Sequence, residues 1–316
     1  MVGKFFVIAS LSMLFGCAAG PGTLPADPEA QLTEADRRLQ AGERSEALHL
    51  YGLVLDQDDR RTDAYVGIGR IHADRNDPIR STIAYAMAYQ YGDRRPEVLW
   101  SLGRAHHRAG RLDRAVELYR MLLDKLPDRT DVRLNLIAAH LQAGWLDPAL
   151  VEAEAAVKQA PRSSPARVAL AEVHGAAGRH REALRQYKRI AGSGPMALPV
   201  LSNAADAALR AGAYGRAAEW LGALVADRPT ERSLVRLGYA WFRLGHDREA
   251  LSAYRRALQI DEESTAALNG LGVVTIRQFE ADGGRDPVLR QTALKWLVRS
   301  VVLDPDQPNV QHLIDR

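Results

Sequence analysis

The chain has 316 residues, of which 47% are hydrophobic, 26% charged and only 6% aromatic. This apolar content suffices for a folded core, and a set rich in Leu and Ala favours helices over sheets. The net charge of +3, from 42 basic and 39 acidic residues, lacks the strong basic excess of nucleic-acid binders, so we expect no nucleic-acid partner. The single cysteine, Cys17, excludes intrachain disulfides and cysteine-based metal sites.

Residues 1–16 have the features of an export signal. Lys4 supplies a positive charge, and the apolar run that follows is too short to span a bilayer and ends at Gly16. The stretch Leu14-Phe15-Gly16-Cys17 resembles the bacterial lipobox, although Phe15 stands where a small residue is usual. The alternative is an ordinary signal peptide that is cut near Ala19.

The lipobox resemblance implies that Cys17 becomes the acylated N-terminus, carrying palmitate or a similar chain. Several buried acyl chains anchor a protein stably, because each buried methylene contributes roughly 0.8 kcal/mol. Ala18 follows the cysteine where an Asp would favour the inner membrane, so the resemblance implies the outer membrane, facing the periplasm. Residues 17–30, rich in Gly, Pro and Ala, then predict a lipidated tether.

Residues 31–316 carry a sequence repeat of about 34 residues. Its marker is a glycine followed five residues later by a small residue, and Asn76 stands where one glycine is missing; the markers are Gly42, Gly110, Gly144, Gly178, Gly212 and Gly245. Seven residues before most markers stands a small residue, and nine after most stands a tyrosine, as at Gly103 and Tyr119. Four repeats close on a proline: Pro127, Pro161, Pro195 and Pro229.

Each repeat predicts a helix, a short turn and a second helix. Gly110 would end the first helix in a backbone conformation that other residues avoid. Gly103 would let the two helices approach closely, and Tyr119 would fill the space beneath the next hairpin. Pro127 would end the second helix. One hairpin cannot bury its apolar face alone, so neighbours must stack.

The whole pattern resembles the tetratricopeptide repeat over about residues 31–305. The resemblance implies an all-α fold: a right-handed superhelix, or α-solenoid, of about eight helical hairpins. The eighth repeat is irregular, because 21 residues separate Gly272 from Ala293 against 12 from Gly238 to Ala250. We therefore expect an inserted loop near residues 279–291, and a short cap after it.

We find no pattern that indicates catalysis or a cofactor. Four histidines share one repeat position, but equivalent positions on stacked hairpins lie roughly 10 Å apart, too far to share a metal; they are His72, His106, His140 and His174. Gly67-x-Gly69 and Gly270-x-Gly272 do not complete a phosphate-binding loop. We predict a protein that is not an enzyme and has no metal or cofactor.

In the tetratricopeptide family, the first helix of each repeat lines a groove through its second, fifth, sixth, ninth and twelfth positions. The resemblance therefore implies these candidate partner-binding residues: Trp100, Arg104, His107, Asn135, Asn203, Arg232, Arg236 and Tyr239. Trp100 either anchors a partner beside Arg104 or packs between neighbouring repeats, and both interpretations remain open.

Three of these candidates, Asn203, Arg232 and Arg236, match part of a carboxylate clamp known in one subgroup of the family. Val168 and Glu172 replace the first Lys and Asn of that clamp. The match therefore implies at most a half-clamp for acidic or C-terminal groups. The alternative is that Arg232 and Arg236 lie on a solvated helix face.

The combination resembles repeat-carrying lipoproteins of bacterial envelope machines. It implies a non-catalytic protein–protein interaction scaffold, anchored through Cys17, that assists assembly of a pilus (Flp/Tad or type IV) or secretion complex. The alternative is a scaffold of a polysaccharide-export or cell-wall synthesis complex. The expected partners are envelope proteins that place an extended peptide or a helix in the groove.

Overall fold

The computed structural model describes residues 27–315, so the predicted signal segment and Cys17 lie outside the described residues. Within that range every regular element is a helix. The chain forms two compact units, an N-terminal unit up to Ala160 and a C-terminal unit from Pro161. None of the helices in residues 27–315 combines the length and apolar character that a membrane crossing requires.

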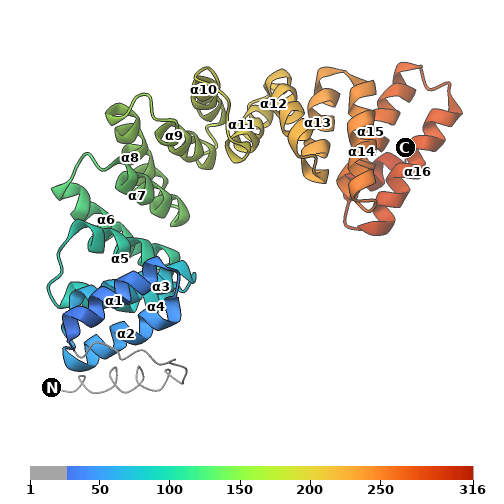
Figure 1. The fold of residues 1–316 in the computed structure, drawn as a ribbon. Helices are drawn as coiled ribbons and strands as arrows, with labels where there is room; N and C mark the ends of the chain where they lie inside the picture. The colour runs from blue at the N-terminus through green and yellow to red at the C-terminus, as the bar shows by residue number, and fades with distance from the viewer. Residues whose placement is uncertain (1–26, 316) are drawn as a thin grey trace. The chain divides into compact units, whose positions relative to one another are not determined.

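The N-terminal unit consists of four helical hairpins, in which each helix packs on the next in chain order (Figure 1, blue to green). The hairpins are α1 (Pro28–Gln40) with α2 (Arg44–Gln57), α3 (Thr62–Asp74) with α4 (Pro78–Gln90), α5 (Pro96–Arg108) with α6 (Leu112–Lys125), and α7 (Thr130–Gln142) with α8 (Leu146–Gln159).

The C-terminal unit consists of four more hairpins and a final short helix, again packed in chain order (Figure 1). The hairpins are α9 (Ser164–Ala176) with α10 (His180–Ala191), α11 (Leu198–Arg210) with α12 (Tyr214–Asp227), α13 (Glu231–Leu244) with α14 (Asp247–Ile260), and α15 (Thr265–Ala281) with α16 (Pro287–Leu303), followed by α17 (Pro308–Asp315). The predicted all-α fold of eight hairpins, with a terminal cap, is confirmed.

The turn inside each of the first seven hairpins depends on one residue with a positive φ. The marker glycines adopt φ values from 72° to 81°, as at Gly110 with 73°. Asn76 adopts φ 55° in the place of the missing glycine, and it is the only other residue type with a positive φ among the described residues. Asn tolerates this left-handed region better than most residues, which explains why the repeat survives the substitution.

Two predicted boundaries are wrong. The first helix begins at Pro28, where the Asp27 side chain accepts a hydrogen bond from the backbone of Ala30, so the predicted tether 17–30 runs into α1. The extra residues of repeat 8 do not form a loop over 279–291. They lengthen both helices to 17 residues, against 14 in α13 and α14, and leave only a short turn at 282–286.

The chemistry of this turn explains the second correction. Gly283 and Gly284 both adopt φ 71°, which ends α15. Asp286 then accepts hydrogen bonds from the first backbone N–H groups of α16, and Pro287 occupies the first helical turn, where its missing N–H costs nothing.

Close helix packing depends on contacts between a glycine and a tyrosine ring. A Cβ on Gly103 would lie 2.7 Å from the ring of Tyr119 in the same hairpin. Tyr254 lies between two glycines, because a Cβ would approach its ring to 2.8 Å from Gly238 and to 2.4 Å from Gly270 of the next repeat. Tyr254 therefore fills the space beneath the next hairpin, as predicted for this repeat position.

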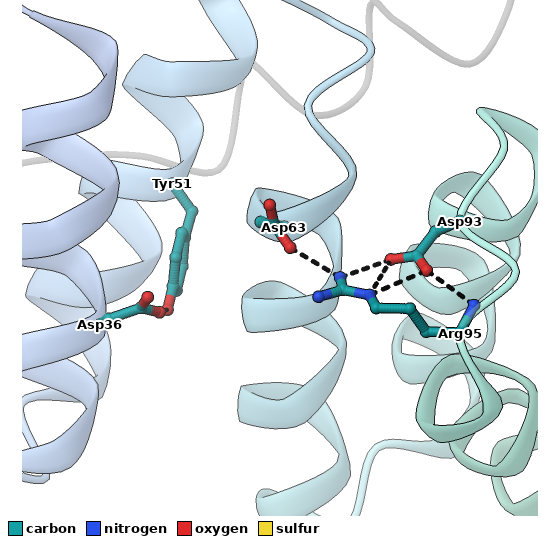
Figure 2. Close-up of polar contacts among 5 residues, drawn as sticks. All are labelled: Asp36, Tyr51, Asp63, Asp93 and Arg95. Carbon is teal, nitrogen blue, oxygen red and sulfur yellow. Dashed lines mark hydrogen bonds and ion pairs between the residues drawn. The ribbon is translucent and has the colours of Figure 1, made fainter.

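A polar contact replaces proline at the end of repeat 2. Asp93 stands where Pro127 ends repeat 3, and its side chain is only 3% exposed. It accepts hydrogen bonds from Arg95 Nε at 3.0 Å and Nη2 at 2.5 Å, while Arg95 also reaches Asp63 at 2.6 Å (Figure 2). Burial opposes ionisation of Asp93, but the hydrogen bonds from Arg95 outweigh it and lower the pKa of this carboxyl group.

Candidate functional site

First helices of consecutive repeats contact one another within each unit, as in the pairs α1 and α3, α5 and α7, and α13 and α15. We call the second, fifth, sixth, ninth and twelfth positions of these helices the first-helix face. Each unit carries four of the predicted partner-binding residues. The N-terminal unit holds Trp100, Arg104, His107 and Asn135, and the C-terminal unit holds Asn203, Arg232, Arg236 and Tyr239.

Trp100 is half-buried and joins repeats 3 and 4. It packs against an apolar cluster drawn from α6 and α7, consisting of Ala115, Val116, Tyr119, Leu122, Leu123, Val132, Leu136 and Ala139. The guanidinium carbons of Arg104 and Arg129 lie 4.8 and 5.7 Å from the centre of the indole ring. The structure therefore favours the packing interpretation of Trp100, with two cations beside its ring.

His107 and Asn135 also form contacts inside the N-terminal unit. His107 Nε2 lies 2.9 Å from Gln142 Oε1, which links α5 to α7. Burial lowers the pKa of His107, against the effect of the Gln142 hydrogen bond. Asn135 Nδ2 donates to the backbone oxygen of Asp131 at 2.9 Å. Of the four residues in this unit, the structure brings Trp100 and Arg104 together.

Two of the three predicted half-clamp residues are paired with acids. Asn203 Nδ2 donates to Glu172 Oε1 at 3.2 Å, and the guanidinium of Arg236 forms an ion pair with Asp206. Arg232 is exposed. An incoming carboxylate would meet the negative charges of Glu172 and Asp206, so this arrangement argues against the predicted preference for acidic groups.

Arg236 and Tyr239 line a pocket of about 400 Å³ between α13 and α15. This volume lies within the range of about 300–1,000 Å³ that is usual for ligand pockets. The other lining residues are Val235, Phe242, Tyr254, Ala266, Asn269, Gly270 and Val273. All except Tyr254 belong to the first-helix face, so the pocket lies on the surface where the sequence predicted partner binding.

Two buried polar atoms in the pocket walls have no hydrogen-bond partner, Nε of Arg236 and Oδ1 of Asn269. The rest of each side chain is held in place. Arg236 Nη2 donates to the backbone oxygen of Ser202 at 3.1 Å, and Asn269 Nδ2 donates to Gln307 Oε1 at 2.6 Å. The walls therefore contain one unbonded donor and one unbonded acceptor, both buried, while the charge of Arg236 is balanced by Asp206.

Sequence reasoning missed the contribution of α15 to this pocket. The sequence feature that could have indicated this contribution is the pair Gly270-x-Gly272. The first glycine contacts Tyr254 of the preceding repeat, and the second contacts Leu297 of its own hairpin. Gly67-x-Gly69 repeats the arrangement against Tyr51 and Tyr85. These motifs therefore mark positions where one helix touches two others.

Of the four equivalent histidines, His140 is buried and the other three are partly buried. His140 is 1% exposed, and its ring lies 5.7 Å from that of Trp145. Burial lowers the pKa of His72, His106 and His140. In the part of the chain that the structure describes, no three His, Cys, Asp or Glu residues converge to hold a metal ion.

Comparison with known protein families identifies tetratricopeptide repeats in three segments of the chain. Models of the tetratricopeptide repeat match residues 96–139, 168–232 and 232–264, and the comparison identifies no catalytic family. No curated protein matches the chain.

Two of three similar solved structures are tetratricopeptide-repeat proteins, and the third is a pilus biogenesis factor. The C-terminal part of a repeat protein from Cytophaga hutchinsonii has a TM-score of 0.64 at 13% identity, covering 76% of this chain and 99% of that one. A repeat protein from Parabacteroides merdae has a TM-score of 0.59 at 15% identity, covering 78% and 98%. PilW, described as a widely conserved type IV pilus biogenesis factor, has a TM-score of 0.55 at 16% identity, covering 65% and 95%. These likenesses establish the fold, and the family models show tetratricopeptide repeats within the three segments that they match.

Proposed function

We propose that this chain is a non-catalytic scaffold that binds other proteins through its first-helix face. The observation that carries the proposal is the pocket between α13 and α15, because it opens on the positions where the sequence predicted partner binding. Exposed Arg232 and Tyr239, which is 39% exposed, lie on the same helix and add polar and apolar contact area.

The scaffold is anchored in the bacterial outer membrane through acylated Cys17 and faces the periplasm. The lipobox-like stretch ending at Cys17 supports this part of the proposal. The Gly-, Pro- and Ala-rich stretch that follows would connect the lipid to α1.

The complex it serves is a pilus or secretion assembly. The combination of a lipobox-like N-terminus with repeats throughout the rest of the chain supports this choice, and the fold that the chain shares with PilW is compatible with it. In this role the repeats hold a partner subunit at several points and release it unchanged.

Site-specific photo-crosslinking in cells tests the partner. A photoreactive residue replaces Val235 in the pocket, and the control carries it at Val302, which is 75% exposed on α16. We expect the Val235 position to crosslink to a pilus or secretion-channel subunit, and the Val302 position not to do so. Crosslinks to polysaccharide-export or cell-wall enzymes alone would overturn the assignment to a pilus or secretion system.

Membrane fractionation tests the anchor. We expect the natural chain to incorporate labelled palmitate and to sediment with outer membranes, and Cys17→Ser to do neither. If Cys17→Ser still fractionates with outer membranes, the lipid is not the anchor.

A further inference from the structure

We propose that the pocket between α13 and α15 binds an uncharged internal peptide segment, with one bulky apolar side chain inside the pocket and one peptide group hydrogen-bonded at its wall. The inference rests on the proposed scaffold function and narrows it to one kind of ligand. It differs from the half-clamp, because the ligand needs neither an acidic side chain nor a free C-terminus.

The shape of the pocket favours a bulky apolar side chain. Its walls include Val235, Phe242 and Val273, and the buried Tyr254 also lines it. Gly270 packs directly on that buried ring, since a Cβ there would lie within 2.4 Å of it, so the pocket keeps a flat floor at this point instead of a side chain. Transfer of an aliphatic or aromatic side chain from water onto these groups is favourable in proportion to the apolar area buried.

The charges at the pocket favour a neutral ligand. Asp206 neutralises Arg236 and is itself 38% exposed, so it would repel an anion that approached from the same side. A lysine or arginine side chain would instead have to shed its water against apolar walls. Of the lining residues only Arg236 carries a charge, and its pair with Asp206 leaves the pocket wall itself neutral, while the exposed Arg232 lies outside the lining.

The unpartnered atoms match a peptide group. Arg236 Nε is a donor and Asn269 Oδ1 is an acceptor, and both belong to pocket walls. A peptide group supplies the carbonyl oxygen that the first requires and the N–H that the second requires. Both atoms are buried, so contact requires the two side chains to turn slightly toward the pocket.

The pocket is already supported before any ligand arrives. Ser202 and Asp206 hold the guanidinium of Arg236 from α11, and Gln307 holds the amide of Asn269 from the segment before α17. These bonds already order the two side chains, so a ligand need only turn them and does not have to order them from a mobile state.

Fluorescence anisotropy with the full chain in detergent micelles tests the apolar part. The probes are labelled heptapeptides, blocked at both ends, with a central Phe, Leu, Ser or Asp. We expect the Phe or Leu peptide to bind at least about tenfold more tightly than the Ser and Asp peptides. Equal affinities for all four, or tighter binding of an unblocked C-terminal carboxylate, would overturn the proposal.

Val273→Arg should reduce binding of the Phe peptide at least about tenfold. The folded chain already accepts Arg70 and Arg104 at the equivalent position of repeats 2 and 3, so the variant is expected to fold. Val302→Arg makes the same change at an exposed site on α16 and should bind as the natural chain does. Unchanged binding by Val273→Arg, with circular dichroism showing native helix content in both variants, would place the ligand elsewhere.

An ester replacing the amide at the central residue of the Phe peptide tests the hydrogen bonds, because an ester has no N–H to donate to Asn269. We expect the ester to bind the natural chain about three- to tenfold more weakly, and to bind Asn269→Leu as well as the amide does. Equal binding of ester and amide to the natural chain would remove the peptide group from the proposal. If Val273→Arg abolishes peptide binding but keeps the crosslinked partner, the scaffold function stands and only its dependence on this pocket fails.

Discussion

Two equivalent junctions, one in each unit, share a backbone contact but differ in surface chemistry. A Cβ on Gly67 would lie 2.2 Å from the Tyr51 ring in the N-terminal unit, as one on Gly270 would lie 2.4 Å from Tyr254 in the C-terminal unit. The Tyr51 hydroxyl donates to Asp36 at 2.6 Å (Figure 2). Tyr254 instead borders the apolar pocket.

The ninth positions of the first helices account for this difference. Asp36 and Arg70 occupy them at the first junction, and Tyr239 and Val273 occupy them at the second. The Gly–Tyr contact therefore sets how closely two repeats approach, while residues beside it decide whether the surface is polar or able to bind an apolar group.

The largest effect is expected from filling the shared contact. Gly67→Ala and Gly270→Ala should each lower the free energy of unfolding by about 1–3 kcal/mol, because the new methyl group overlaps a tyrosine ring. Gly222→Ala, a helical site with no atom within 4 Å, should instead raise it by about 0.5–1 kcal/mol. Urea unfolding measures all three. Similar values for Gly67→Ala and Gly222→Ala would show that the contact does not set repeat spacing.

The next effect concerns the polar contact that the N-terminal unit has in the place of a proline. Asp93→Asn should lower the free energy of unfolding by about 1–2 kcal/mol, because it weakens charged hydrogen bonds to Arg95 at a buried site; Arg95 stays partly solvated, which limits the loss. Glu117→Gln weakens the exposed ion pair with Arg114 and should change the free energy of unfolding by less than about 0.5 kcal/mol. Equal losses in the two variants would mean that burial of Asp93 contributes nothing.

A smaller effect separates the two junctions directly. Tyr51→Phe removes the hydrogen bond to Asp36 and should lower the free energy of unfolding by about 0.5–1.5 kcal/mol. Tyr254→Phe keeps the ring and should change stability by only a few tenths of a kcal/mol. Urea titrations of the two variants provide the measurement, and a larger loss for Tyr254→Phe would reverse the comparison.

The last effect depends on pH and should be strongest in the N-terminal unit. Burial lowers the folded-state pKa of His72, His106 and His140, so the unfolded chain binds more protons once pH falls through about 6.5. Stability should therefore decrease from pH 7.5 to pH 5.5. Amide hydrogen exchange at the two pH values should show the greater loss of protection in α3, α5 and α7. His140→Leu should reduce that loss, and an unchanged pH response would contradict the assignment.

The repeat register was predictable from sequence because it depends on which residue types occur at a few local positions. Only glycine or asparagine readily adopts a positive φ, so Gly110 and Asn76 locate the turns without any tertiary information. The tyrosine spacing likewise predicted Tyr119 and Tyr254 as interior residues, and both are buried.

The chemistry of the candidate site was less predictable because it depends on contacts between repeats. Arg236 resembled a free cation in sequence, yet it bonds Ser202, which lies 34 residues earlier, and pairs with Asp206. The helix ends in repeat 8 were also not predictable, because the repeat period does not indicate whether extra residues lengthen a loop or two helices. The identity of Cys17 as a lipid site remains a prediction.

The final helix has a consequence for recognition. Gln307, just before α17, accepts from Asn269 and donates to the backbone oxygens of Ser300 and Asp304. This chain of hydrogen bonds fixes which end of the Asn269 amide faces away from Gln307. In an array where another hairpin followed α16, Asn269 could rotate by half a turn and present a donor instead. Helix α17 and the segment before it thus determine whether the neighbouring surface presents a hydrogen-bond acceptor or a donor. Exchanging this segment between related arrays offers a way to change which peptides they bind.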